Sequence, residues 1–257
     1  MSELPGDSAG VPWAGRHFEP IAHSDDDGSA PEKLIEALHR FRAGELGETD
    51  VVDALRESRL LIPLVARLGD GGLDAHAGAH GLPVDKTQEL SIVTVAGPDG
   101  RTVLPAFTSV AAMAAWNPSA RPVPATAPRV ALAAASEDTD LVVLDPTSAT
   151  EFVIRRPALW AIAQAQAWLP SYLDTEVLAA FMDAAEPESA VIAVQLAPGD
   201  PHSRLAGPEL IVQLSLVDGL DRAALDAVVG RMQQRWSASE LIAARVDSLK
   251  VQLVGAA

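Results

Sequence analysis

The sequence predicts an α+β protein built from two sequential units, each with helices packed on a mixed sheet. Apolar residues at helical spacing and strand-like runs follow one another without the strict strand–helix–strand period of a parallel α/β protein. The segment GPDG between two apolar runs predicts an antiparallel hairpin. The segment LPSYLD, at residues 169–174, separates two stretches that each carry helices and strands. We therefore expect a flexible acidic tail over residues 1–28, an α+β domain over 29–170 and a smaller α+β domain over 171–257.

The first unit begins with two predicted helices. In SAPEKLIEALHRF, Ser29 has the position of an N-cap and Glu32 that of its capping-box partner, while apolar residues recur on one helical face. A second short helix follows Thr49 as its cap and leads into an apolar strand over residues 59–68. The glycine-rich residues 69–86 show no periodic pattern and predict a loop.

The rest of the first unit mixes strands with short helices. A proline-rich stretch, NPSARPVPATAP, carries no regular pattern between two of these helices. In chain order we expect hairpin strands over 90–96 and 101–104, a helix over 109–116, an alanine-rich helix ending near Ala135, a strand over 140–146, the short strand EFVI, and a helix over 157–168.

The second unit repeats this mixture on a smaller scale. Its long helix places Leu225, Val228, Met232 and Trp236 on one face, which indicates a helix packed on a sheet. The expected elements are a helix over 175–185, strands over 190–197 and 208–217, a helix over 221–236 and a final strand over 244–254.

Composition and charge exclude several functional classes. The chain of 257 residues has no cysteine, which excludes disulfides, thiolate metal sites and cysteine nucleophiles. A formal charge of −16 disfavours nucleic acid and anionic membrane surfaces as partners, because both require clustered Lys and Arg. The N-terminal residues lack the pattern of a signal peptide, and no apolar run is long enough for a membrane helix. We therefore expect a cytoplasmic protein.

Five segments occur in an order that resembles a known family. They are LLIPL, DGRTVLPAFTSVAAMAAW, RPVPATAPRVALAAA, LVVLDP and RRPALWAIAQ, all within residues 30–168. In this order they resemble the N-terminal domain of the SseB family, named for enhanced serine sensitivity, and residues 174–257 are similar to the C-terminal region that often follows it. The resemblance implies an α+β domain in a cytoplasmic bacterial protein and supplies no catalytic residues.

Two hydroxyl residues, Thr108 and Ser109, stand between an apolar run and a helical pattern in PAFTS. A nucleophilic hydroxyl would need an adjacent base and an oxyanion site, and no G-x-S-x-G elbow surrounds these residues. The favoured interpretation is that one hydroxyl caps the helix. An exposed helix N-terminus here would also bind an anion, so both residues remain candidate ligand contacts.

Two arginines, Arg155 and Arg156, precede a predicted helix in FVIRRPALWAI. Cations are unfavourable at this positive end of the helix dipole, so something should compensate them. The compensation is an internal carboxylate, plain solvation, or a bound phosphate or carboxylate, which paired guanidiniums suit. Arg155 and Arg156 are therefore candidate ligand-binding residues.

The remaining polar motifs do not complete a metal or cofactor site. His76 and His80 have the spacing of two imidazoles on one helical face, but the glycines around them predict a loop, so they are weak metal candidates. The acidic run SDDDG fails the calcium-loop pattern, because Leu34 stands where a glutamate is required. No P-loop or complete dinucleotide fingerprint occurs, and we expect no cofactor and no metal.

Four tryptophans, Trp116, Trp160, Trp168 and Trp236, lie on or beside helical patterns, and most of the four are expected in the core. Trp168 precedes LPSY at the expected boundary. It either packs the two units together or serves as an exposed anchor for a protein partner.

The sequence favours a non-catalytic protein that regulates or binds an unidentified partner protein. One alternative is a binder of an anionic small metabolite near Arg155 and Arg156. Another is an enzyme whose site is assembled from residues distant in sequence, so enzymatic activity is left open and its absence favoured. The formation of a homodimer and any relation to serine metabolism are also left open.

Overall fold

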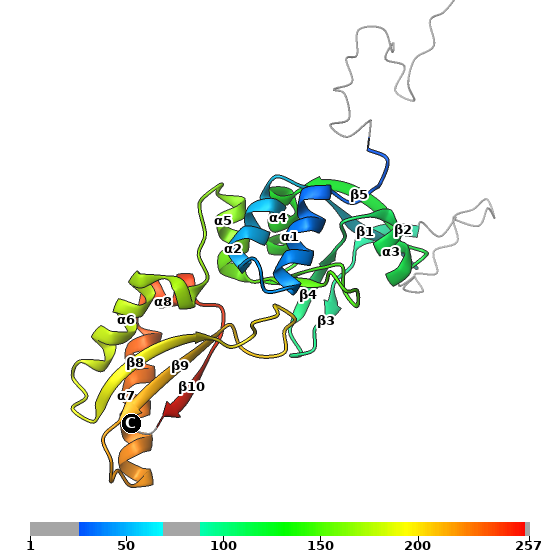
Figure 1. The fold of residues 1–257 in the computed structure, drawn as a ribbon. Helices are drawn as coiled ribbons and strands as arrows, with labels where there is room; N and C mark the ends of the chain where they lie inside the picture. The colour runs from blue at the N-terminus through cyan, green and yellow to red at the C-terminus, as the bar shows by residue number, and fades with distance from the viewer. Residues whose placement is uncertain (1–25, 69–87, 255–257) are drawn as a thin grey trace, which may run out of the picture.

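The computed structural model describes residues 26–68 and 88–254, which form two lobes (Figure 1). The N-terminal lobe comprises the described residues up to 168, and the C-terminal lobe comprises residues 169–254. Each lobe has its own cluster of buried apolar side chains, and helices pack on mixed sheets as the α+β class predicts. The expected division into domains over residues 29–170 and 171–257 stays a prediction.

The N-terminal lobe contains most of the elements. They are α1 Glu32–Arg42, α2 Glu48–Arg56, β1 Arg59–Leu68, β2 Gln88–Ile92, β3 Val95–Ala96, β4 Thr102–Ala106, α3 Val110–Trp116, β5 Arg121–Thr126, α4 Ala127–Ser136, β6 Val142–Leu144, β7 Phe152–Ile154 and α5 Arg156–Ala163. The C-terminal lobe contains the 3₁₀ turn η1 Ser171–Leu173, then α6 Thr175–Ala185, β8 Val191–Pro198, β9 Leu210–Leu216, α7 Arg222–Ser237, α8 Glu240–Arg245 and β10 Leu249–Val254.

Two sheets form the centre of the N-terminal lobe. One has the order β2-β1-β5, and the other has the order β3-β4-β6-β7, in which only the β4–β6 pair is parallel. Leu61 and Phe107 join the sheets through two backbone hydrogen bonds of 2.8 and 2.9 Å. Alternate residues of β4, β6 and β7 face the helices α1, α2, α4 and α5, and their neighbours face the opposite side, as the pleat of a strand requires.

The predicted hairpin is correct only in part. The GPDG turn closes through a hydrogen bond of 2.7 Å from the Gly97 N–H to the Arg101 carbonyl, and Gly100 takes a φ of 82° that favours glycine. The expected first strand, residues 90–96, is divided between β2, which pairs with β1, and the short β3, which pairs with β4. Periodicity alone does not show which sheet an apolar run will join.

Several expected boundaries were wrong. The proline-rich stretch contains strand β5, which pairs with β1 along residues 59–64 and is an edge strand among the described residues. Proline lacks an N–H, and an edge strand tolerates that loss. Helix α5 ends at Ala163, well before Trp168, and residues 240–245 form helix α8 ahead of the final strand.

The predicted caps of the first two helices were also wrong. Pro31, and not Ser29, is the N-cap of α1, which has no side-chain cap. Helix α2 begins one residue before Thr49, and its N-cap is Gly47, whose N–H donates to Asp50 at 2.9 Å. In both cases the residue type suited a cap, but the chain entered the helix at a neighbouring residue.

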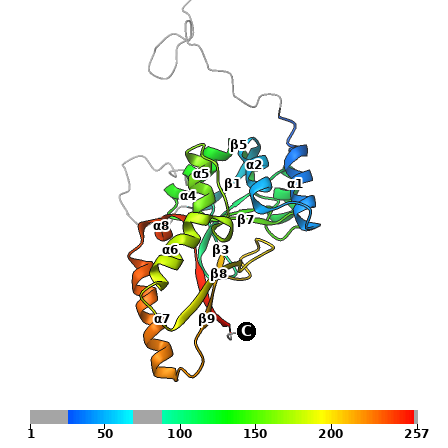
Figure 2. The same cartoon turned by 60° about the vertical axis from the view of Figure 1, so that its left-hand side comes forward.

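The C-terminal lobe has one sheet, of order β10-β9-β8, with helices on one face (Figure 2). Strands β9 and β10 are parallel, and α7 and α8 cross between them. Alternate residues of β9 are buried against the helices, beside a contact of Phe181 with Trp236 at 5.2 Å between ring centroids. No helix in the described part of the chain combines the length and the apolar character that crossing a bilayer requires.

The loop between β8 and β9, residues 199–209, extends from the C-terminal lobe to the sheet β3-β4-β6-β7 of the N-terminal lobe (Figure 1). The Val153 N–H donates to the Ser203 carbonyl at 2.8 Å. Leu205 packs into a small apolar cluster with Val103 and Val143. The junction between the lobes therefore has both backbone and side-chain contacts.

Candidate functional site

The junction between the lobes holds the candidate arginine Arg155. It is the N-cap of α5, and its side chain is 8% exposed. Its guanidinium donates to Asp200 at 2.8 Å and to Asp247 at 3.0 Å, and both carboxylates come from the C-terminal lobe. Arg101, at the end of the hairpin turn, donates twice to Asp247 at 3.0 Å. Internal carboxylates therefore compensate Arg155, which was one of the three interpretations left open by the sequence.

The second arginine, Arg156, lies at the surface of the same junction. Its guanidinium donates to the carbonyl oxygens of Ala243 and Val246 at 2.8 and 2.9 Å, at the C-terminal end of α8. A cation is favourable at this negative end of a helix dipole. The guanidinium also lies over the ring of Trp160, 5.2 Å from its centroid. Both arginines thus connect the lobes, and both guanidiniums donate to groups of the C-terminal lobe.

Two further carboxyl groups lie at this junction: that of Glu209 is buried and that of Glu48 is half-buried. Glu209 accepts from the Ser171 hydroxyl at 2.7 Å and from the Asp247 N–H at 2.6 Å, and burial raises the pKa of its carboxyl. Glu48 accepts from the Ser203 hydroxyl of the other lobe at 3.0 Å. Burial raises the pKa of the Glu48 carboxyl to about 7, against the lowering effect of the hydrogen bond from Ser203. We therefore expect the charge of Glu48 to change near neutral pH.

The hydroxyls of Thr108 and Ser109 have structural partners. Thr108 is 1% exposed; its hydroxyl and its N–H donate to the Asp145 carboxylate at 2.7 and 2.8 Å. Burial raises the pKa of Asp145. The Ser109 hydroxyl accepts from the Ala112 N–H at 3.0 Å and is the N-cap of α3, the capping arrangement favoured by the sequence. Because Thr108 is buried, this structure gives a substrate no access to its hydroxyl.

The weak metal candidates His76 and His80 lie outside the described residues. Within residues 26–68 and 88–254, no group of three or more histidine, aspartate or glutamate side chains is arranged to hold a metal ion.

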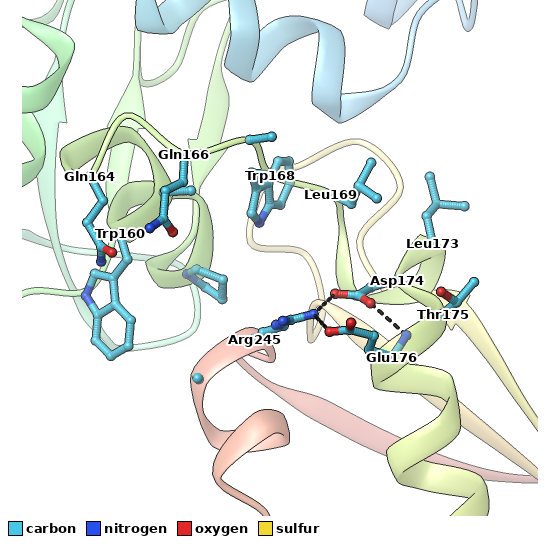
Figure 3. A pocket seen from close by; sticks show the side chains of 14 residues that line it. Trp160, Gln164, Gln166, Trp168, Leu169, Leu173, Asp174, Thr175, Glu176 and Arg245 are labelled. Atoms are coloured by element: carbon cyan, nitrogen blue, oxygen red, sulfur yellow. Dashed lines mark hydrogen bonds and ion pairs between the residues drawn. The ribbon is translucent and has the colours of Figure 1, made fainter.

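An open groove lies beside the junction, on the side of α5 and α8 (Figure 3). Its volume is about 680 Å³. The N-terminal lobe contributes α5 and the segment after it, and the C-terminal lobe contributes η1, the start of α6 and the end of α8. Its lining residues are Pro157, Trp160, Ala161, Gln164, Gln166, Ala167, Trp168, Leu169, Leu173, Asp174, Thr175, Glu176, Ala244 and Arg245.

Large apolar side chains in this groove are exposed. The exposed fractions are 44% for Trp160, 54% for Leu169 and 58% for Leu173. Trp168 is half-buried and packs against the core of the N-terminal lobe. Single exposed apolar residues are ordinary on protein surfaces, but several in one recess indicate a binding surface.

Sequence reasoning selected only Trp168 among these residues. It expected most of four tryptophans in the core: Trp236 is buried at 4% exposed, Trp116 and Trp168 are half-buried, and Trp160 is exposed. Leu169 and Leu173 were missed, although large apolar residues in a segment between two units are a signal that could have been used.

The rim of the groove carries a small ionic cluster. Arg245 lies 2.9 Å from an Asp174 oxygen and 2.6 Å from a Glu176 oxygen, and both hydrogen bonds raise its pKa. Asp174 also caps α6 by accepting from the Glu176 N–H at 2.9 Å. In this cluster two carboxylates share one guanidinium, so the cluster has an excess of negative charge. The Glu176 side chain is 64% exposed and can take a further cation.

Comparison with known proteins gave one finding. Residues 34–161 match the family model of the SseB protein N-terminal domain. The chain carries an SseB N-terminal domain. The matched residues run from the first turn of α1 to the last turns of α5, so the SseB domain includes Arg155, Arg156 and Trp160 but ends before Leu169. A search of curated proteins and a search of solved structures each found no match to the chain.

Proposed function

We propose that this protein is a non-catalytic module that binds a partner protein in the groove beside the junction. The partner contributes a short apolar segment that also carries basic residues. The observation that carries this proposal is the presence of three large, exposed apolar side chains, Trp160, Leu169 and Leu173, in one groove of about 680 Å³. An interface typically places such anchors at its centre.

Charge supports the basic character of the partner. The ionic cluster at the rim has two carboxylates for one guanidinium, and the whole chain has a formal charge of −16. A basic segment is therefore attracted at long range and finds Glu176 at the rim, whereas an acidic segment is repelled.

The hydrogen bonds of Thr108, Arg155 and Arg156 support a non-catalytic role. Thr108 is buried on Asp145, and the two guanidiniums are used within the junction. The alternative function, binding of an anionic metabolite near Arg155 and Arg156, has less support for the same reason. A cytoplasmic location is part of the proposal and rests on the absence of cysteine.

Titration with designed peptides tests the proposal. A peptide of leucine and lysine at helical spacing, without tryptophan or tyrosine, is added to the full chain while tryptophan fluorescence is recorded, because Trp160 and Trp168 line the groove. Its counterpart has glutamate in place of lysine. The lysine peptide should bind at least about tenfold more tightly.

Three variants locate the binding. Leu169→Ser with Leu173→Ser should weaken binding of the lysine peptide by about tenfold or more, and Glu176→Lys should remove its advantage over the glutamate peptide. Leu132→Ser is the matched control, because Leu132 is 61% exposed on α4 outside the groove. Equal binding of both peptides, or equal losses in the double variant and in the control, would contradict the proposal.

A further inference from the structure

A second recess lies on the face of the sheet β3-β4-β6-β7 that points away from the helices. Its volume is about 470 Å³, within the range usual for small-molecule sites. The buried side chains of Val103, Val143, Val153 and Leu205 line it, and the half-buried Trp116 completes the apolar wall. The remaining lining residues are Val95, Ala96, Gly97, Pro98, Pro105, Pro146, Thr147, Glu151 and Arg204.

Two loops with unusual backbone conformations border this recess. Thr147, in the β6–β7 loop, has a φ of 67°, and Leu205, in the β8–β9 loop, has a φ of 54°. Residues other than glycine avoid this region, and it recurs at ligand-binding sites where the surroundings hold it in place. Here the Thr147 N–H donates to Glu151 at 2.6 Å, and Leu205 is anchored in the apolar cluster and by its N–H to Asp200 at 2.7 Å.

The lining of this recess carries one arginine, Arg204, and one glutamate, Glu151. The Arg204 guanidinium is exposed, and the hydrogen bonds that it donates within the described residues, to the Ser148 and Ala149 carbonyls, are both long at 3.4 Å. Arg42 is nearby: burial, and then the charge of Arg204, lower its pKa. The Arg42 guanidinium donates to the backbone carbonyls of Glu151 and His202, and the Glu151 carboxylate accepts from the Thr147 N–H, so the Arg204 guanidinium is the charged group of the lining that is available to a ligand.

We propose that this recess binds a small carboxylic acid with an apolar body. The carboxylate pairs with Arg204, for which a planar guanidinium is well suited. The apolar body lies against Val103, Val143 and Trp116. This site is separate from the groove of the proposed function, since the two recesses share no lining residue.

The test uses three probes of one shape: 3-phenylpropionate, its neutral amide and the corresponding ammonium compound. Each is titrated into the full chain and followed by calorimetry or ligand-observed NMR. The carboxylate should bind with a dissociation constant on the order of 1 mM or tighter, as expected for a ligand of this size. The amide should bind at least about tenfold more weakly, and the ammonium compound more weakly still.

Variants tie the binding to the recess. Arg204→Gln should reduce affinity for the carboxylate to that for the amide, whereas Arg222→Gln, at a side chain 94% exposed on α7, should leave it unchanged. Ala96→Phe, at an exposed position lining the recess, should fill it and weaken all three probes. Leu173→Ser, in the groove, should have no effect.

Several results would overturn the proposal: equal affinity for the carboxylate and the amide, an unchanged affinity in Arg204→Gln, or no binding at about ten times the expected dissociation constant. Arg204 and Ala96, the two positions substituted in the recess, are exposed, so both variants should fold. Thermal unfolding verifies this.

Discussion

The two sides of the junction between the lobes differ in what they bury. On the polar side, the side chains of Arg155, Asp200 and Asp247 are 8%, 3% and 2% exposed. On the groove side, Leu169 and Leu173 are more than half exposed. A buried charge that loses its partner is strongly destabilising, so we expect an intact polar side to be required for the lobes to stay together. Exposed apolar side chains contribute hydrophobic free energy only when a partner buries them, so the groove side is suited to binding.

Arg155→Met should give the largest loss of stability. It leaves Asp200 and Asp247 buried with a missing partner, and such a loss costs about 3–5 kcal/mol in the free energy of unfolding. With about 2–4 °C per kcal/mol, the melting temperature should fall by roughly 10 °C. Thermal unfolding at pH 7 measures this effect.

Arg156→Met is the matched control for this substitution, because its guanidinium lies at the surface and donates to carbonyl oxygens. It should lower the melting temperature by less than half as much. If both variants unfold at the temperature of the wild-type protein, the polar side does not hold the lobes together.

Glu48→Gln should change how stability depends on pH. The folded pKa of about 7 lies above the usual value of 4.5, so between these pH values the folded protein keeps a proton that the unfolded chain has lost. This contribution to stability is therefore full below about pH 4.5 and is lost as pH rises to about 7. Glutamine does not ionise, so the variant should be more stable than the wild type at pH 8, by on the order of 1–3 kcal/mol.

Thermal unfolding from pH 5 to pH 8 measures the difference in stability between Glu48→Gln and the wild type. This difference should become small near pH 5. Glu209, Asp200 and Arg155 also face Glu48, and they remain unchanged in the variant. Glu176→Gln, at an exposed side chain, serves as the control and should follow the wild-type profile. Parallel pH profiles for wild type and Glu48→Gln would show that Glu48 is ionised in the folded protein throughout.

Ser109→Ala should have a moderate effect. It removes the acceptor for the Ala112 N–H at the start of α3, and the loss of such a cap costs about 1 kcal/mol. Chemical denaturation should show a lower midpoint with an unchanged slope. A much larger loss would mean that Ser109 does more than cap the helix.

Leu169→Ser with Leu173→Ser should have the smallest effect on stability. Both side chains are mostly exposed, and surface substitutions usually stay within about 0.5 kcal/mol. An unchanged melting temperature together with lost peptide binding would sharpen the contrast between the two sides. A fall in melting temperature comparable to that of Arg155→Met would contradict the contrast between the polar side and the groove side.

Local patterns predicted the parts of the fold that are decided locally. The cap at Ser109 and the face of α7 that buries Met232 and Trp236 depend on neighbours within a few residues. The partners of Arg155 are 45 and 92 residues away, and local sequence could not select them among 35 acidic residues. Strand β5 was likewise not predictable from local sequence, because it is a strand through its hydrogen bonds to β1, which is distant in sequence.

The candidate site was only partly predictable for a related reason. Trp168 was selected because it stands near a change of unit, but the exposure of Trp160 depends on how α5 lies relative to α8. Exposure of this kind comes from packing between lobes, which no periodicity within one helix specifies.

Photo-cross-linking in cells tests the central claim, that the groove binds a protein partner, most directly. A benzophenone amino acid replaces Leu173 in one sample and Leu132, equally exposed outside the groove, in another. Irradiation should give a discrete heavier product only from position 173, and the added substitution Leu169→Ser should remove it. The same products from both positions, or none from position 173, would contradict the claim.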